Sequence, residues 1–280
     1  MGDNMAYKHW TIDELPWDKL DSAKVDDKLL SVIKAASLVE YNSDTYADYL
    51  CKVFKDDEAF KIMTRQWAVE EIQHGQALAD WAMKIDPTWD FKAAVKRFRQ
   101  GYTPEHFLGN GDTPRGSKSG EMVARCMVET ATSSYYSAIG DSVDEPVLKE
   151  ICKKIAGDEF RHYKLFYDTM QRYLTKEGLG RLGRLKVAVG RIAESEDDEL
   201  AYAYYAANAD KHAVYDRETY SRAYLQKAYG FYNRPVVDRA VAMIFKACGF
   251  KPHSLSYKVA SAVAWRKFNK QAEELRQKAA

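Results

Sequence analysis

Along most of this chain, apolar residues recur at intervals of three and four, and this spacing predicts helices rather than strands. The first predicted helix covers residues 26–54. The second covers residues 58–84 and is expected to stop there, because Pro87 disfavours helical backbone at the residue before it. A third helix is predicted over residues 121–139 and a fourth over residues 146–174. The expected fold class is therefore all-α.

The segments outside these four helices differ in character. Residues 1–25 combine tryptophan and proline with acidic residues and are expected to form a packed irregular arm. Residues 86–120 hold several glycines and one short helical stretch, which predicts a long connection between two helix pairs. Further helical stretches are expected at residues 200–215, 235–247 and 264–278. One domain is predicted over residues 1–280, with the arm at 1–25, a four-helix bundle at 26–175 and additional helices packing on it at 176–280.

Two of the predicted helices carry a Glu-x-x-His pattern, Glu71 with His74 and Glu159 with His162. Residues three apart on a helix lie about 60° apart in azimuth and one turn apart in height, so a carboxylate and an imidazole at this spacing can converge on one point. A single copy is weak support for a metal site, because two polar residues three apart arise often by chance. Two copies on paired helices are much stronger.

Two further glutamates, Glu40 and Glu129, interrupt the apolar surroundings of the first and third helices. Counted in residues, each glutamate lies about as far before the break of its helix hairpin as the paired Glu-x-x-His pattern lies after that break. Because both helices rise by the same amount per residue, an antiparallel hairpin places the glutamate and the pattern at the same height. One glutamate from each of two helices and Glu-x-x-His from each of two others is the di-iron or di-manganese arrangement of a four-helix bundle. The long connection favours the ferritin-like topology, a bundle with one long crossover. The predicted ligands are Glu40, Glu71, His74, Glu129, Glu159 and His162, with Glu71 and Glu159, or a glutamate of the first or third helix, bridging two metal ions.

Three more residues are candidates for supporting roles. Glu70 and Asp158 precede the motif glutamates, and we expect each to accept a hydrogen bond from the histidine of the opposite motif, which would fix that imidazole as a ligand. Thr132 lies one turn beyond Glu129 and is predicted to stand beside the metals on the dioxygen side as a catalytic proton donor. The alternative for Thr132 is a back-bond to the carbonyl of residue 128.

Composition narrows the function further. The formal net charge of +1 gives no overall attraction to polyanions, so nucleic acid is not a favoured partner. No apolar run approaches the ~18 residues of a membrane span, and the four scattered cysteines indicate a reducing compartment, so a cytoplasmic protein is expected. Four histidines outside the motifs have no matched partners and are interpreted as surface or core residues: His9, His106, His212 and His253.

The motifs resemble those of the soluble acyl-[acyl-carrier-protein] desaturases within the ferritin-like di-iron superfamily. Trp67-x-x-Glu70-Glu71-x-x-His74-Gly75 is similar to one family motif, and Ala156-x-Asp158-Glu159-x-Arg161-His162 is similar to the other. A threonine also follows the helix-three glutamate by three residues, as in the family. The resemblance covers about residues 30–175. Ile72-Gln73 and Tyr135-Tyr136 depart from the family pattern, and the bulk of the two tyrosines would reshape an acyl tunnel.

The resemblance implies an oxygen-dependent di-iron oxidoreductase that acts on an apolar, carrier-bound fatty-acyl substrate, most concretely a desaturase. Its cofactors would be two iron ions, with manganese as the alternative, and dioxygen would be the co-substrate. An external ferredoxin or reductase is expected to supply electrons, since no flavin or iron–sulfur signature is present. An acidic acyl carrier protein and a homodimer are further partners that the resemblance leaves open. The carrier would dock on a basic stretch of the chain, and the alternative interpretation is that this stretch is only a solvated face. Its residues are Arg172, Lys176, Arg181, Arg184, Lys186 and Arg191.

Alternatives from the same superfamily are another di-iron oxygenase, either a hydroxylase or an N-oxygenase, and a ferroxidase or iron-handling protein. All of these use the same six ligands, so the fold and the metal do not by themselves name the reaction. Many tyrosines are expected among the four helices, and we interpret them as aromatic core packing, with a redox tyrosine as the other reading.

Overall fold

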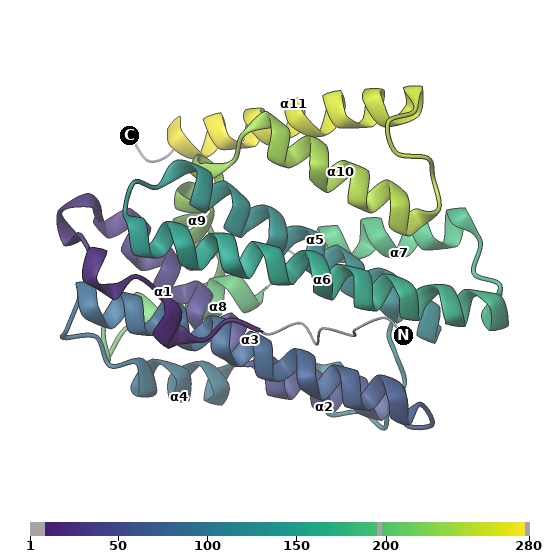
Figure 1. The fold of residues 1–280 in the computed structure, drawn as a ribbon, viewed down its shortest axis with the longest axis horizontal. Coiled ribbons are helices and arrows are strands. Elements are labelled where there is room, and N and C mark those ends of the chain that lie inside the picture. Colours follow the sequence, from purple (N-terminus) through teal and green to yellow (C-terminus); the bar gives the residue numbers. More distant parts are fainter. Residues whose placement is uncertain (1–8, 195–197, 278–280) are drawn as a thin grey trace, which may run out of the picture.

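The computed structural model describes residues 9–194 and 198–277. Within these ranges the chain forms α-helices and short 3-10 turns and contains no strand. The core is a ferritin-like helical bundle built from α1 (Asp27–Tyr41), α3 (Glu58–Ile85), α5 (Lys118–Ser142) and α6 (Pro146–Glu177). In this bundle α1 packs on α3 and α5 packs on α6, while α3 and α6 also meet (Figure 1). The all-α class predicted from the apolar spacing is confirmed.

Local sequence sets the ends of the long helices. Asp57 caps α3 by accepting a hydrogen bond from the N–H of Phe60, and the helix ends at Ile85, two residues before Pro87. At α6 the Glu145 carboxylate accepts from two N–H groups of the first turn, and Pro146 occupies the first helical position. The other end of α6 is closed by Gly178 with φ of 67°, a left-handed conformation that glycine adopts without strain.

The helix predicted over residues 26–54 is in fact two helices, and this prediction is corrected. It breaks at Asn42, after which α2 runs over Ser43–Val53. Two hydroxyls bond to carbonyls here, that of Ser43 to Glu40 O at 2.6 Å and that of Thr45 to Asn42 O at 2.8 Å. Side chains of this kind offer the backbone an alternative to helical hydrogen bonds. The break directly follows the candidate ligand on α1.

A glycine brings α1 and α3 close together beside the candidate ligands. A Cβ atom added to Gly75 would lie 2.5 Å from Tyr41 N and 2.8 Å from Ser37 O. Such distances are well inside van der Waals contact, so only glycine fits at this position without moving α1. Because His74 immediately precedes Gly75, the close approach places the imidazole of α3 next to the carboxylate of α1.

Two apolar clusters fill the bundle, one on each side of a polar layer. The first includes Leu38 of α1, Trp81 of α3 and Ile139 of α5. The second includes Phe60 of α3 and Phe166 of α6, together with much of α2. The candidate ligands lie in the layer between the two clusters, where the four main helices face one another. Burying apolar surface above and below this layer fixes its height in the bundle.

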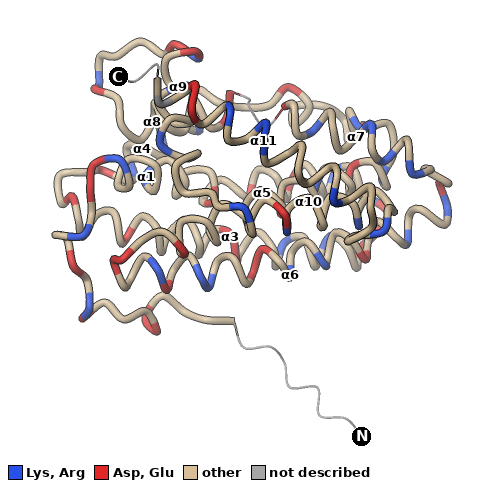
Figure 2. The backbone as a smooth tube through the Cα atoms, turned by 90° about the horizontal axis from the view of Figure 1, so that it is seen from above, with Lys and Arg blue, Asp and Glu red and all other residues tan. Residues whose placement is uncertain are grey.

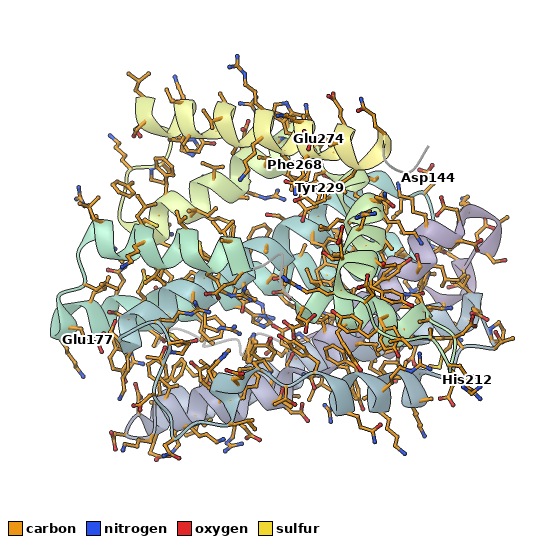
Figure 3. All side chains as sticks on the ribbon, turned by 180° about the vertical axis from the view of Figure 1, so that it is seen from behind. Asp144, Glu177, His212, Tyr229, Phe268 and Glu274 are labelled. Carbon is orange, nitrogen blue, oxygen red and sulfur yellow. The ribbon has the colours of Figure 1, made fainter. Side chains whose placement is uncertain are left out.

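The remaining helices surround the bundle. The long connection carries α4 (Phe91–Gly101), and the C-terminal part contains α7 (Arg181–Glu194), α8 (Asp198–Asn208), α9 (Arg217–Ala228), α10 (Arg234–Cys248) and α11 (Leu255–Gln277). Here α8 contacts α1, whereas α7 and α10 contact α5. The outermost layer holds α11, where Phe268 stacks on Tyr229 with ring centroids 4.4 Å apart (Figure 3).

Several details of this outer part differ from the sequence predictions. The helix predicted over residues 200–215 ends at Asn208, and α7 and α9 were not predicted. Two predictions extend beyond the described residues: the predicted arm includes residues 1–8, and the last predicted helix includes residue 278. None of the described helices has the length and apolar character needed to cross a membrane. The four cysteines form no disulfide.

Candidate metal centre

The structure brings the six predicted ligands into one layer of the bundle. α1 contributes one glutamate near its C-terminal end, α5 contributes another from its middle, and α3 and α6 each contribute a glutamate and a histidine one turn apart. All six side chains lie in the interior, with exposed fractions of at most 6%. They are Glu40, Glu71, His74, Glu129, Glu159 and His162.

The ligand atoms fall into two groups of four, each compact enough for one metal ion. One group joins Glu40 and His74 with Glu71 and Glu159, and within it the candidate ligand atoms lie within 4.8 Å of one another. The other joins Glu129 and His162 with the same two carboxylates, at the same limit. Glu71 and Glu159 thus belong to both groups. Sharing of this kind is what we expect of carboxylates that bridge two metal ions.

The two imidazoles turn the same ring atom inward. Nδ1 of His74 lies 3.2 Å from Glu71 Oε2 and 3.3 Å from Glu159 Oε1. Nδ1 of His162 lies 3.0 Å from Glu71 Oε1. Each Nε2 therefore points out of the layer, which leaves Nδ1 as the atom available to a metal.

The hydrogen bonding of the layer fits a bound cation. Both carboxylate oxygens of Glu129 are buried without a hydrogen-bond partner. A buried polar atom left unpaired costs about 1–3 kcal/mol, and a charged one costs more. Oxygen and imidazole donors of this set are the usual ligands of iron and manganese in such bundles.

Electrostatics within the layer show the same need for positive charge. Burial raises the pKa of Glu40 and of Glu129, and their carboxylate neighbours add to this effect. Burial also opposes ionisation of Glu71, but the adjacent imidazoles of His162 and His74 outweigh it and hold the pKa of Glu71 low. The pKa values of both histidines are raised despite burial, because carboxylates surround each ring.

Glu70 and Asp158 lie where we expect them from the sequence, each against the histidine of the opposite motif. His74 Nε2 is 3.0 Å from Asp158 Oδ2, and His162 Nε2 is 2.9 Å from Glu70 Oε2. Arg161 joins the two carboxylates, since it donates to Glu70 at 3.0 Å and to Asp158 at 2.5 Å. Burial opposes ionisation of Glu70, but the hydrogen bond from His162 and the nearby cations lower its pKa to about 2.

The N-terminal arm completes this outer network, a role that sequence reasoning missed. Asp158 Oδ2 accepts a hydrogen bond from Trp10 Nε1 at 2.7 Å and lies 2.7 Å from His9 Nε2. Gln73 donates to His9 Nδ1 at 3.2 Å, so Nε2 carries the proton that His9 donates to Asp158. The indole of Trp10 also stacks on His74, with centroids 6.0 Å apart and planes 5° apart. His9 is thus a neighbour of the cluster, and its interpretation as an unmatched surface or core residue is corrected.

The other three unmatched histidines lie elsewhere. His106 packs edge-on against Tyr49 with centroids 4.9 Å apart, and burial lowers its pKa. His212 is exposed at the edge of the molecule (Figure 3). His253 lies in the turn before α11. None of these three belongs to a possible metal-binding group within the described residues.

A cavity of about 60 Å³ opens on the carboxylate face of the layer. Thr132 lies on its wall and donates to Glu159 Oε2 at 2.7 Å, in addition to long contacts with Val128 O at 3.3 Å and Glu129 O at 3.4 Å. The hydroxyl therefore touches a candidate bridging ligand and also makes the local back-bond. Four glutamates of the layer line the cavity, whereas neither His74 nor His162 does. Arg125 and Arg191 also line it, and sequence reasoning missed both in this position.

Behind the layer, Tyr136 is fully buried and donates to Glu40 Oε1 at 2.5 Å. Burial raises its pKa, and the Glu40 carboxylate raises it further. Tyr135 lies beside it, edge-to-face, with centroids 5.3 Å apart. The hydrogen bond of Tyr136 thus joins α5 to α1 next to the layer.

The basic stretch predicted as a carrier-docking face is only partly free. Arg172 pairs with Asp57 at 3.1 Å, and Arg184 donates to the carbonyl of Ala247 at 3.3 Å. Arg181 and Lys186 on α7 are exposed. Figure 2 shows Lys and Arg positions along α7, at the end of the molecule away from α1.

Fold and layer together define the class of the protein: a ferritin-like helical bundle with a carboxylate–histidine cluster that fits two metal ions. A family model described as "Fatty acid desaturase" matches residues 19–229, about three quarters of the chain. The chain belongs to this family.

Curated relatives agree with this assignment at low identity. Stearoyl-[acyl-carrier-protein] 9-desaturase 6 of Arabidopsis thaliana is 23% identical over 177 residues, which cover 59% of this chain and 44% of the relative. Acyl-[acyl-carrier-protein] desaturase 3 of Oryza sativa subsp. indica is 25% identical over 58% of this chain and 42% of the relative. The putative acyl-[acyl-carrier-protein] desaturase DesA1 of Mycobacterium tuberculosis is 23% identical over 55% of this chain and 46% of the relative. The aligned stretch spans less than half the length of each relative.

Proposed function

We propose that this chain is an oxygen-dependent di-iron oxidoreductase that removes hydrogen from an acyl-type substrate, with desaturation as its reaction. The observation that carries the proposal is the pair of ligand groups that share Glu71 and Glu159. Family membership supports the reaction class, and the names of the relatives support an acyl substrate. Manganese is the alternative metal, because it accepts the same oxygen and nitrogen donors.

The charge of the proposed ligand set suits two divalent ions. Four carboxylates balance two such ions, so the filled cluster would be neutral and would leave no uncompensated charge in the apolar bundle. Glu40 and His74 would hold one ion, Glu129 and His162 the other, and Glu71 and Glu159 both. Iron held in this way would supply the dioxygen-activating redox chemistry.

The protein's own residues would supply orientation and protons. Asp158 and Glu70 hold the two imidazoles by their Nε2 atoms, which keeps each Nδ1 aimed at the cluster. Thr132 contacts Glu159 from the cavity, and this contact supports a role in which its hydroxyl would donate a proton during the reaction. Val39, Val128 and Trp67 give part of the cavity an apolar lining.

The balanced reaction requires an outside source of electrons. Desaturation of a CH₂–CH₂ unit consumes one dioxygen, two electrons and two protons, and it yields the alkene and two molecules of water. Two of the four electrons that reduce dioxygen come from the substrate, and a ferredoxin or a reductase would supply the other two. An acyl carrier protein is the corresponding proposal for delivery of the substrate. The exposed Arg181 and Lys186 of α7 would attract such an acidic partner.

Dioxygen uptake by the iron-loaded protein tests this proposal. Ferrous protein with a reductant, a ferredoxin and acyl-carrier substrates should consume dioxygen in proportion to alkene formed, as measured by mass spectrometry. Glu58→Ala, an exposed change on α3, provides the matched control. Dioxygen uptake that tracks only the ferrous iron supplied, with mineral iron as the product, would instead identify a ferroxidase. A hydroxylated product would identify the hydroxylase alternative.

A further inference from the structure

The cavity on the carboxylate face of the layer is where the proposed reaction would need protons. Its volume of about 60 Å³ has room for a few water molecules, since one water needs about 10–15 Å³. The proposed desaturation consumes two protons for each dioxygen that is reduced. Thr132 lies on the cavity wall, where its hydroxyl donates to Glu159 at 2.7 Å. A hydroxyl carries a single proton, so every proton that Thr132 gives up must be replaced by another group.

Few of the side chains that line the cavity can supply this replacement. Four of its five glutamates are the candidate metal ligands, which bind the ions in the loaded protein. The guanidinium groups of Arg125 and Arg191 stay protonated in proteins and therefore release no proton. Burial raises the pKa of Tyr46, and the nearby Glu199 carboxylate raises it further, so this phenol also keeps its proton. Among the described residues that line the cavity, Glu199 is the one carboxylic acid outside the ligand set.

The fold holds Glu199 at the cavity wall from outside the four-helix bundle. It is the second residue of α8, one of the additional helices that surround the bundle. Tyr46 of α2 donates to its Oε2 at 2.6 Å and thereby fixes the carboxylate. The residue is half-buried and lines the cavity, so both solvent and the cavity border its side chain. A carboxyl group in this position can take up a proton from solvent and pass it inward.

The charges around Glu199 suit a group that gives up protons. Arg125 of α5 lies over the ring of Tyr46, 5.0 Å from the centroid, and Arg191 of α7 lines the same cavity. Both cations stabilise the carboxylate that remains after Glu199 has released a proton. Tyr102 is a further titratable neighbour, since it contributes to the raised pKa of Tyr46.

We propose that Glu199 is the proton donor of the cavity and that it acts through water and the hydroxyl of Thr132 on the dioxygen that is being reduced. The inference rests on the proposed oxidative function and adds to it a residue from outside the bundle. The carboxylic acid of Glu199 loses its proton to cavity water, and Thr132 gains one proton as it releases another. No electron moves in these transfers. Solvent then returns a proton to the Glu199 carboxylate, so two such cycles supply the two protons that the reaction consumes.

Glu199→Gln tests the inference in the iron-loaded full chain. Glutamine keeps the size of the side chain and an oxygen that can accept from Tyr46, but it has no acidic proton. When ferrous protein is mixed once with dioxygen, without acyl substrate, dioxygen consumption should slow about tenfold or more. A larger share of the dioxygen should leave as hydrogen peroxide, while metal content and melting temperature should stay at the wild-type values. Glu218→Gln, an exposed change on α9, is the matched control.

Chemical rescue separates proton donation from a structural role. Glu199→Ala removes the carboxyl group and leaves space in which a small acid can take its place. Formic acid and acetic acid should restore the rate of this variant in proportion to the concentration of the protonated acid. Acetamide, which has the shape of acetic acid but no acidic proton, should not restore it. The same additives should leave the rate of the wild-type protein unchanged.

Three outcomes would overturn the inference. A wild-type rate in Glu199→Gln would show that protons enter by another route. Equal rescue of Glu199→Ala by acetamide and acetic acid would mean that the side chain only fills space. A clearly lower melting temperature or metal content in Glu199→Gln would make Glu199 a structural partner of the arginines. Wild-type protein that holds two iron ions but consumes no dioxygen would instead count against the proposed function itself.

Discussion

The two faces of the ligand layer differ in how their buried polar groups are paired. On the histidine face, Asp158 and Glu70 each take several hydrogen bonds, and the arm covers them with Trp10 and His9. On the cavity face, both oxygens of Glu129 and Nε of Arg125 are buried without partners. Buried polar groups are normally paired, so a set of unpaired groups marks a place where something else binds.

From this difference we expect the histidine face to hold the metal ions and the cavity face to carry the reaction. The histidine face fixes the tautomer and orientation of two imidazoles, so changes there should alter metal affinity more than the rate of the loaded enzyme. The cavity face offers room, a hydroxyl and a cation, so changes there should alter turnover or substrate binding and leave the metal content intact. Mutations on the two faces can therefore be distinguished by what they change.

The largest effect is expected from a carboxylate that both ligand groups share. Glu71→Ala removes a carboxylate that belongs to both ligand groups, and metal content after anaerobic ferrous loading should fall to less than one ion per chain. Glu58→Ala, exposed on the same helix, should retain the wild-type content. Elemental analysis of desalted protein measures both. Full metal content in Glu71→Ala would remove it from the ligand set.

On the cavity face, Thr132→Val should slow turnover by about 10²-fold, since a positioned proton donor contributes at least this much. Metal content should not change. Thr130→Val is the matched control, because the Thr130 hydroxyl on the same helix bonds to the carbonyl of Cys126 at 2.7 Å and lies outside the cavity lining. If Thr132→Val turns over at the wild-type rate, its hydroxyl serves only the local back-bond.

On the histidine face, Asp158→Asn should weaken metal binding by about 10- to 100-fold. The rate of the fully loaded variant should remain closer to wild type than that of Thr132→Val. His9→Ala should weaken metal binding less, because Trp10 and Arg161 still donate to Asp158. Competition with a chelator gives the affinities. Asp168→Asn, on the exposed face of α6, serves as the control, and equal affinities for Asp158→Asn and Asp168→Asn would contradict the role of this network.

A smaller effect, on the frame that both faces share, is expected at Gly75. Gly75→Ala forces a methyl group against the backbone of α1 and should destabilise the fold by about 1–3 kcal/mol. Gly157→Ala in α6 meets nothing within 4 Å and should be neutral or stabilising by up to about 1 kcal/mol. Urea denaturation of the two variants compares them directly. Equal stabilities would mean that α1 moves aside at little cost.

Local spacing explains which of these features the sequence could predict. Glu71 and His74 lie three apart on one helix, and Glu70 and Asp158 each adjoin a motif glutamate, so helix geometry alone places them. His9 and Asp158 are 149 positions apart and share no periodic pattern, so only the tertiary fold brings them together. Arg125 carried a usable signal, because its spacing of four from Glu129 places it on the inner face of α5.

The break at Asn42 and the helices α7 and α9 show a second limit. No proline or glycine marks the break, and it depends on hydroxyls that bond to carbonyls only once the chain turns. α7 carries apolar residues at helical spacing, but Leu182, Leu185, Val189 and Ile192 are exposed and Ala188 is its one buried residue. Such helices take their stability from neighbours that the sequence does not identify.

The most direct test of the central claim is a crystal structure of the protein after anaerobic ferrous loading, with anomalous scattering recorded at the iron edge. The account predicts two iron peaks per chain, both within the layer, with carboxylate oxygens of Glu71 and Glu159 between them and one histidine Nδ1 on each. A single peak, or a peak outside the six predicted ligands, would contradict it.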